Sequence, residues 1–363
     1  MEYKRIEELT SVVTGGTPST SKAEYWDEGD IPWLQSGCCQ NCDVYEAEKY
    51  ITQIGYDNSS TRMMPVDTVM IALTGATAGK IGYLNFEACG NQSITGILPC
   101  DELNQRYLYF YLISQRNKIL ADCIGGAQPH ISQGYVKNMR VPVPTKEEQQ
   151  SIVEKLKGLI EIISQRQKEI ELLDDLIKAR FVELFGDPSL NTKGYPIKSL
   201  PEIAEYWNGL TYKPENVADE GTIVLRSSNI QNAQLDFEDT VRVTCSIGEK
   251  KYVQDNDILM CSRNGSARLV GKVALIKNIE EPMSFGAFMM IIRSQYYPYL
   301  ITFFQMPAFR AQIATGATTT INQITGRMLD NVKLPVPDKT ELDNFISFIE
   351  QVDKSKVVAL KAA

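Results

Sequence analysis

Short apolar runs separated by polar turns make up two long stretches of the chain, and each run has the length of a β-strand. The runs predicted as strands are Val69–Leu73, Ile81–Leu84, Ile258–Met260 and Val273–Ile276. Helices are predicted at Leu103–Ala121 and Tyr299–Ala314. The longest apolar run, Gly286–Ile292, is also strand-sized and far shorter than the roughly 20 residues that cross a bilayer. These stretches are therefore predicted to be α+β domains without a membrane span.

Two other stretches have heptad spacing, which places apolar side chains three and four residues apart on one helix face. In the first helix, predicted over 146–185, these residues are Ile152, Leu156, Leu159, Ile163, Arg166, Ile170, Leu173 and Ile177. Gly186 and Pro188 end this helix. In the second, predicted over 339–363, they are Leu342, Phe345, Ile349, Val352, Lys356 and Ala359. We expect the two helices to pair antiparallel.

The chain repeats itself at an offset of about 190 to 194 residues. The clearest match is Arg140-Val-Pro-Val-Pro144 with Lys333-Leu-Pro-Val-Pro337. The other matches are Gly125–Gln133 with Thr315–Gln323, Gly79–Ile81 with Gly271–Val273, and Gly15 with Gly209. A register kept over this length predicts two domains of similar fold.

The repeat and the helices together predict four parts. They are a first domain at 1–145, a first spacer helix at 146–185, a second domain at 186–338 and a short second spacer helix at 339–363. The expected fold class is α+β, with two similar domains separated by long helices that form an antiparallel coiled coil. Since the second helix is shorter, either the chain is truncated or another molecule covers part of the first helix. The seam residues left for a partner subunit or a second copy are Ile152, Leu156, Leu159 and Ile163.

The charge of the chain does not by itself favour nucleic acid, because phosphate contacts need Lys and Arg. The net charge is −8. Residues 1–145 carry 11 basic and 16 acidic residues, and residues 186–338 carry 15 and 16. If DNA binds, we expect a basic partner to supply much of the phosphate affinity. The charged start, Met1–Glu8, is not a signal peptide, so a cytoplasmic protein is expected.

Several kinds of chemistry are disfavoured by the sequence. Cys38, Cys39 and Cys42 form a cluster, but there is no second CxxC and His130 is the single histidine, so reduced thiols are favoured over zinc. Leu73–Ile81 resembles a P-loop, but its glycines are one residue too close and Ile81 stands where Ser or Thr must bind magnesium. One histidine leaves little room for Ser–His–Asp chemistry. The Asn/Asp-Pro-Pro-aromatic motif of adenine methyltransferases is missing. We therefore expect no catalytic residues, no metal and no cofactor on this chain.

The whole chain resembles the specificity (S) subunit of type I restriction–modification systems. The features that carry the resemblance are the order domain, long helix, domain, helix, and the V/L-P-V-P segment followed by an acidic or Gln-rich helix start, Glu147–Gln150 and Glu341–Asp343. Glu183-Leu-Phe-Gly-Asp-Pro188 ends the first helix. The resemblance implies two target-recognition domains that each read half of a bipartite double-stranded DNA site. It also implies two modification subunits that carry S-adenosylmethionine and methylate adenine, and a restriction subunit that can join them.

Base edges in DNA are read by side chains that donate and accept hydrogen bonds, such as Arg on guanine and Asn or Gln on adenine. The loops of the first domain offer Gln35, Ser36, Thr74, Thr77, Lys80, Gln128 and His130. Those of the second offer Arg226, Ser227, Asn229, Arg263, Asn264, Arg268, Lys272, Thr318, Thr319 and Thr320. Arg263 and Arg268 stand out, because they flank a glycine-containing loop that suits insertion into a groove. Residues of these types also build turns and caps.

A second class of function is compatible with the same sequence. Two domains on a coiled coil can act as a non-catalytic interaction scaffold that does not bind DNA. Binding of the chain and its methyltransferase to random duplexes would distinguish the two hypotheses.

Overall fold

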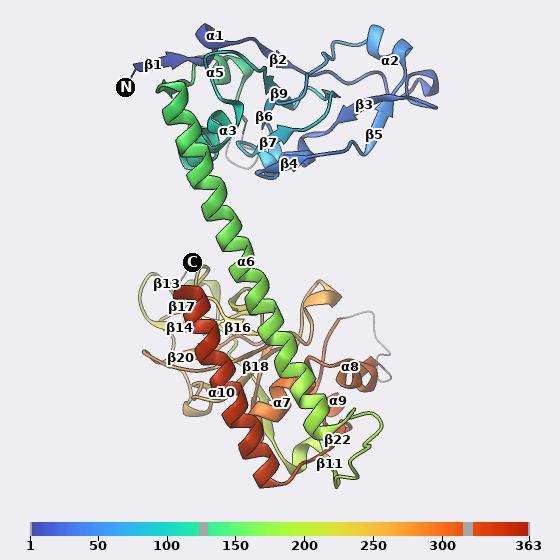
Figure 1. Ribbon diagram of the computed structural model, residues 1–363. Helices are drawn as coiled ribbons and strands as arrows, with labels where there is room; N and C mark the ends of the chain where they lie inside the picture. The colour runs from blue at the N-terminus through green and yellow to red at the C-terminus, as the bar shows by residue number, and fades with distance from the viewer. Residues whose placement is uncertain (1, 123–129, 315–321, 362–363) are drawn as a thin grey trace. The chain divides into compact units, whose positions relative to one another are not determined.

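The computed structural model describes residues 2–122, 130–314 and 322–361 and divides the chain into two compact units, Met1–Ile162 and Ile163–Ala363. Both units combine helices with small sheets, as the α+β prediction requires (Figure 1). In the described part of the chain, no helix is both long enough and apolar enough to cross a membrane.

The first unit is built on a five-stranded sheet in the order β2-β9-β6-β7-β4. Its strands are β2 (Val12–Thr14), β4 (Cys42–Val44), β6 (Val69–Ala72), β7 (Ile81–Leu84) and β9 (Ile94–Ile97). A smaller sheet holds β3 (Ile31–Leu34), β5 (Lys49–Ile51) and β8 (Cys89–Gly90). The first Pro-x-Pro segment, β10 (Arg140–Val143), pairs antiparallel with β1 (Glu2–Arg5). The two ends of the domain therefore close on each other.

The helices of the first unit are α1 (Ile6–Leu9), α2 (Gln53–Asp57), α3 (Gln105–Ser114), α4 (Arg116–Ala121) and α5 (Gln133–Asn138). The single helix predicted at Leu103–Ala121 is wrong in two respects. It begins two residues later, because the Asn104 side chain caps it by accepting hydrogen bonds from the backbone of Arg106 and Tyr107. It is also broken at Gln115, which ends α3 and precedes α4.

The second unit repeats this plan. One sheet runs β12 (Glu205–Asn208), β21 (Met289–Arg293), β18 (Ile258–Cys261), β19 (Val273–Leu275). Another runs β13 (Val217–Ala218), β17 (Arg242–Val243), β14 (Thr222–Leu225), β20 (Met283–Phe285). The second Pro-x-Pro segment, β22 (Lys333–Pro335), pairs with β11 (Ile197–Ser199), and β15 (Ile230–Gln231) forms a hairpin with β16 (Gln234–Leu235).

The helices of the second unit are α7 (Tyr297–Phe304), α8 (Pro307–Ala314) and α9 (Gly326–Asp330). The predicted Tyr299–Ala314 helix is again two helices. Pro307 begins the second, because proline lacks the N–H that would continue the first and fits the first turn of a new helix.

Two long helices have the bounds expected from the heptads. Helix α6 spans Lys146–Phe185 and ends at Gly186, whose φ of +75° suits glycine, and α10 spans Lys339–Lys361. Within the second unit, α10 packs against the C-terminal half of α6 (Figure 1). Lys356 donates to Asp174 at 2.5 Å, whereas Phe345 contacts Phe181 with ring centroids 5.8 Å apart, so the pair is antiparallel as predicted.

The two units are related by the predicted repeat, with one correction to its register. The backbone N–H of Ile131 donates to Leu73, and that of Ile324 donates to Ser262. Ser132 and Thr325, the next residues, cap α5 and α9. Ile131 therefore corresponds to Ile324, and its predicted pairing with Ile321 is wrong by three residues; the parts of that match at 125–129 and 315–321 lie outside the described residues. Ile, Thr and Gln residues occur on both sides of the correct alignment, which explains why the sequence match was displaced by three positions.

The match of Gly15 with Gly209 is confirmed by packing. A Cβ at Gly15 would lie 2.0 Å from the Gly90 carbonyl oxygen, and one at Gly209 would lie 2.1 Å from that of Phe285. Both glycines are needed because β8 and β20, which carry those carbonyls, pass directly over them.

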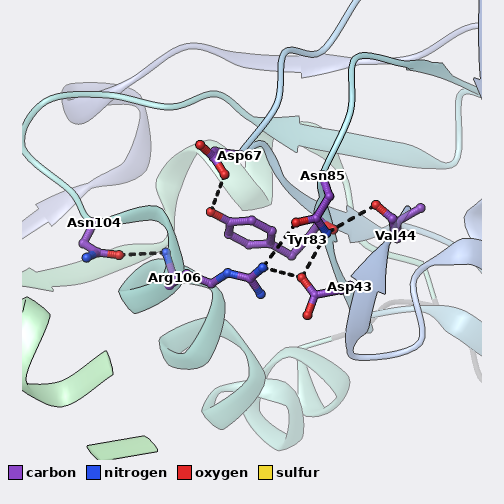
Figure 2. A network of polar contacts seen from close by, with 7 residues as sticks. All are labelled: Asp43, Val44, Asp67, Tyr83, Asn85, Asn104 and Arg106. Carbon is purple, nitrogen blue, oxygen red and sulfur yellow. Dashed lines mark hydrogen bonds and ion pairs between the residues drawn. The ribbon is translucent and has the colours of Figure 1, made fainter. Parts of the chain in front are cut away.

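A polar network ties α3 to the main sheet of the first unit (Figure 2). The Arg106 guanidinium binds the Asp43 carboxylate and lies 3.4 Å from the centroid of the Tyr83 ring. Asn85 donates to Asp43 at 3.0 Å, and the Tyr83 hydroxyl donates to Asp67 at 2.8 Å. These contacts join residues from β4, β7 and α3 that lie far apart in the sequence, so the network should stabilise the domain and not act on a ligand.

We expect Arg106→Met to destabilise the first unit by about 1.5–3 kcal/mol, because it leaves the half-buried Asp43 carboxylate without its charged partner. Urea unfolding followed by hydrogen exchange, read separately for residues 2–122 and 163–314, measures the loss in each unit. Lys118→Met, at an exposed position on the neighbouring helix α4, is the control and should change little. Equal losses in both units would contradict this local role.

The same pair should make the first unit sensitive to acid. Burial raises the pKa of Asp43, but the hydrogen bonds from Arg106 and Asn85 outweigh burial and hold that pKa below its usual value. The contribution of a lowered carboxyl pKa is complete above the unfolded value of about 3.9 and is lost as pH falls through the folded pKa. Asp43→Asn should therefore unfold more easily at pH 7 and show a weaker loss of stability below pH 4.

The three residues of the cysteine cluster stay close together but differ in burial, and the Cys42 thiol donates to the Cys38 carbonyl at 3.7 Å. Cys39 is buried in the core beside Met70 and Leu84, whereas Cys42 is exposed. All the cysteines in the described ranges are free thiols, and those residues contain no group of three or more side chains able to hold a metal ion.

Candidate nucleic-acid interface

The second unit contains a hollow of about 980 Å³ at one end of its sheets. Five separate segments line it: Leu210–Tyr212 after β12, Arg226–Ser227 after β14, Arg263–Gly265 after β18, Gly286–Met289 from the end of β20 into the start of β21, and Asn322. Strand ends and loops from both sheets therefore converge on one site, which is where binding residues are commonly found.

Four of the predicted reading residues line this hollow. They are Arg226, Ser227, Arg263 and Asn264, which come from two loops 37 residues apart in the sequence. Nothing in the spacing of these loops shows that they meet. The fold therefore brings together some, but not all, of the reading residues predicted for this domain.

The polar side chains around the hollow are held in different ways. Arg226 forms an ion pair with Asp239 at 2.8 Å. The Asn264 amide donates to the Ser227 hydroxyl at 3.1 Å and accepts from the Ser266 backbone at 3.0 Å. The Arg263 guanidinium lies 5.2 Å from the centroid of the Phe288 ring. These contacts anchor the glycine-containing loop after β18 that the sequence singled out.

Other predicted residues of the second domain lie elsewhere. Asn229 is buried, and its amide donates to the backbone of Asp236 and Asp239, so it builds its own loop. Arg268 lies exposed on a short 3-10 helix, Ala267–Leu269, and Lys272 follows that helix half-buried; neither is among the described residues that line the hollow. Thr318, Thr319 and Thr320 fall outside the described residues.

The first unit presents its predicted residues at the corresponding ends of its own strands. Gln35 and Ser36 follow β3, and Thr74 and Thr77 follow β6. His130 is exposed and forms a β-bridge with Thr74. Lys80 donates to Gln40 at 2.5 Å, and Gln128 lies outside the described residues.

The repeat pairs these positions between the units. Gln35 corresponds to Arg226, since each precedes a 3-10 turn after its strand, and Thr74 corresponds to Arg263, since each is bridged to the segment before α5 or α9. Corresponding positions thus carry different side chains on a common backbone plan. That pattern is expected of two domains that bind related but different targets.

Phe288 and Tyr212 also line the hollow and were missed in the sequence. Phe288 is 58% exposed, and β21 begins only at Met289. The apolar run Gly286–Ile292 therefore contains a surface aromatic at its start, which its composition conceals. Its position directly after Gly286 and Ala287 was the available signal, because small residues favour a turn there.

The predicted partner-binding residues of α6 differ in exposure. Leu159 and Ile163 are 52% and 54% exposed, Leu156 is half-buried, and Ile152 packs against the core of the first unit. Ile160 and Ile162, which the heptad pattern omitted, are also exposed. The middle of α6 therefore carries a cluster of apolar side chains on its surface, which is typical of an interaction site.

Comparison with known proteins agrees with this architecture. Residues 1–172 match the family described as Type I restriction modification DNA specificity domain. The EcoR124I/EcoR124II specificity subunit of Escherichia coli is 30% identical over 193 residues, 49% of this chain and 48% of that protein. The EcoKI specificity subunit of Escherichia coli K12 is 23% identical over 378 residues, 96% of this chain and 81% of that protein.

The chain spans about half the length of the curated relatives that it matches first, 48% of one and 52% of the other. A solved structure, described as the structural basis of complex assembly and conformational transition of the type I R-M system, matches with a TM-score of 0.57 and 16% sequence identity. It covers 99% of this chain and 92% of its own, which supports the fold. Residues 1–172 thus match a type I restriction–modification specificity domain, and the chain as a whole is similar to type I specificity subunits.

Proposed function

We propose that this chain recognises a bipartite double-stranded DNA sequence, one half through each unit, and recruits subunits that methylate adenine. The observation that carries the proposal is the repeated placement of different polar side chains at corresponding strand ends, Gln35 and Thr74 in one unit, Arg226 and Arg263 in the other. A common backbone with different side chains allows two half-sites to be read separately.

In this proposal the chain has no catalytic residue of its own and needs no cofactor. Two modification subunits would carry S-adenosylmethionine, and a restriction subunit can join the same complex in the cytoplasm, where the DNA lies. The low basic content of both domains supports this division of labour, because the phosphate backbone must then be neutralised largely by partners.

The test is a DNA-binding and methylation assay on random duplexes, with the chain alone, the modification subunits alone, and the complex. We expect methyl transfer only from the complex and only at one bipartite motif. Methyl transfer by the chain alone at the rate of the complex would disprove the division of labour. If the complex forms but neither binds nor methylates any sequence selectively, the chain is a scaffold that does not read DNA.

We also propose that the exposed apolar cluster on α6 binds a modification subunit. Leu159 and Ile163 lie four residues apart, on one helix face, so aspartates there would place two charges in the same interface. Leu159→Asp with Ile163→Asp should weaken assembly at least about tenfold, measured by titration of the modification subunit. Both substituted side chains are exposed, so the units should remain folded.

The matched control is Leu190→Asp, which places the same charge at a position 72% exposed in the loop after α6. It should leave assembly unchanged. Normal assembly of the double variant would show that this cluster is not the docking surface.

A further inference from the structure

Most arginines near the sheets of the second unit are used within the protein. Arg242 and Arg293 form bidentate ion pairs with Glu281 and Asp257, Arg226 pairs with Asp239, and Arg310 donates to the Val270 carbonyl. Arg263 is exposed, and among the described residues its guanidinium has no hydrogen-bond acceptor and no carboxylate. Its charge is therefore available to a ligand in the hollow that it lines.

The position of Arg263 is nevertheless fixed. The Arg263 backbone N–H donates to the Phe288 carbonyl at 3.1 Å, and on the other side Arg263 forms a β-bridge with Gln323. The guanidinium lies over the Phe288 ring, a cation–π contact that restricts its rotamers. Arginine held in this way loses little conformational freedom when it binds, which favours a geometrically selective contact.

The neighbouring polar side chains form hydrogen bonds that hold the loop carrying Arg263. Both ends of the Asn264 amide are occupied by Ser227 and Ser266, and Asn322 donates to the Gly265 carbonyl at 3.2 Å. These contacts hold the loop after β18 from both sides. Asn264 is thus a positioning residue for Arg263.

The lining of the hollow suits a base edge better than a phosphate. Phe288, Met289 and Leu210 give it an apolar wall, against which a hydrated phosphate gains little. A base in the groove presents its edge, which combines polar atoms with apolar carbon, and guanine presents O6 and N7 there as a pair of acceptors that matches the two donors of one guanidinium.

We propose that Arg263, held over Phe288, reads a guanine in the half-site recognised by the second unit. This inference rests on the proposed function, since it presupposes that the unit binds DNA, and it adds the base and the side chain that selects it. Arg263 is then the specificity-determining residue at one position of the motif, and Arg268, exposed on the neighbouring 3-10 helix, contributes charge without selecting a base.

The experiment uses the full chain assembled with its modification subunits and reads the methylated motif by sequencing of modified bases. The wild-type motif should contain a guanine in the half-site assigned to the second unit. Arg263→Gln should reduce discrimination at that position by roughly 10- to 100-fold, while all other positions stay as they were. Arg263→Lys keeps the charge but not the planar pair of donors, so it should retain affinity and still lose discrimination.

The control is Arg268→Gln, which removes an equal charge from the same loop region. It should lower affinity for all sequences alike and reduce the salt dependence of binding by about one charge, with the motif unchanged. The inference is overturned if the half-site has no guanine, if Arg263→Gln leaves the motif intact, or if Arg263→Gln behaves like Arg268→Gln, which would make Arg263 a phosphate contact. A wild-type complex that selects no sequence would instead remove the proposed function itself.

Discussion

If the chain has the proposed function, exchange of residues 1–145 for the first domain of a type I specificity subunit should change one half of the DNA motif and leave the other half as it was. The reason is that the first domain closes on itself: β1 pairs with β10, and its core residues come from residues 6–153. Among the described residues, no strand pairing crosses the junction. The half-site read by the second unit should therefore be unaffected, and sequencing of modified bases in cells carrying the chimaera measures both halves together.

The position of the junction matters for the stability of this chimaera. Gln149 and Val153 lie on α6 but are buried against the first unit, where Gln149 accepts from the Asn104 backbone at 2.7 Å. A junction after 145 leaves these two residues facing a foreign domain, whereas a junction after residue 157 transfers them with their own partners. Both chimaeras should show the same new half-site, and the second should be the more stable. A change in both halves of the motif would refute independent reading.

The fold could be predicted from the sequence where local patterns and tertiary structure agree. The Pro-x-Pro segments, the bounds of α6 and the seam of α10 were all visible, because proline, glycine and heptad spacing act on the backbone directly. The break at Gln115 and the correct register of the repeat could not be predicted, because neither changes the spacing of hydrophobic residues.

The candidate site was less predictable, because its residues meet only through the fold. Loop composition proposed both Arg263 and Asn229 as reading residues, yet one side chain is exposed beside a hollow and the other is buried in its own loop. Phe288 was hidden in an apolar run that resembled a strand. What separates these residues is burial and hydrogen bonding, and neither can be obtained from residue type alone.

The heptad pattern of α6 conceals a change of role along the helix. Towards its C-terminal end, Phe181 and Phe185 are fully buried in the core of the second unit. The Phe181 ring lies 4.8 Å from that of Tyr299 and 5.8 Å from that of Phe345, so it joins α6 to α7 and α10 at once. The end of this helix is therefore part of the second domain as well as a spacer.

Phe181→Ala should destabilise the second unit by about 3–5 kcal/mol, because it removes a buried ring from a cluster that cannot easily collapse into the space. Hydrogen exchange during urea unfolding should show the loss in β18 and β21 and leave the first unit unchanged. Val182→Ala, at the next position on the helix and 43% exposed, is the matched control and should cost no more than about 0.5 kcal/mol. If both variants lost the same small amount of stability, α6 would be only a spacer attached to a domain that folds without it. A large loss confined to Phe181→Ala would mean that an exchange of the second domain must carry this end of α6 with it.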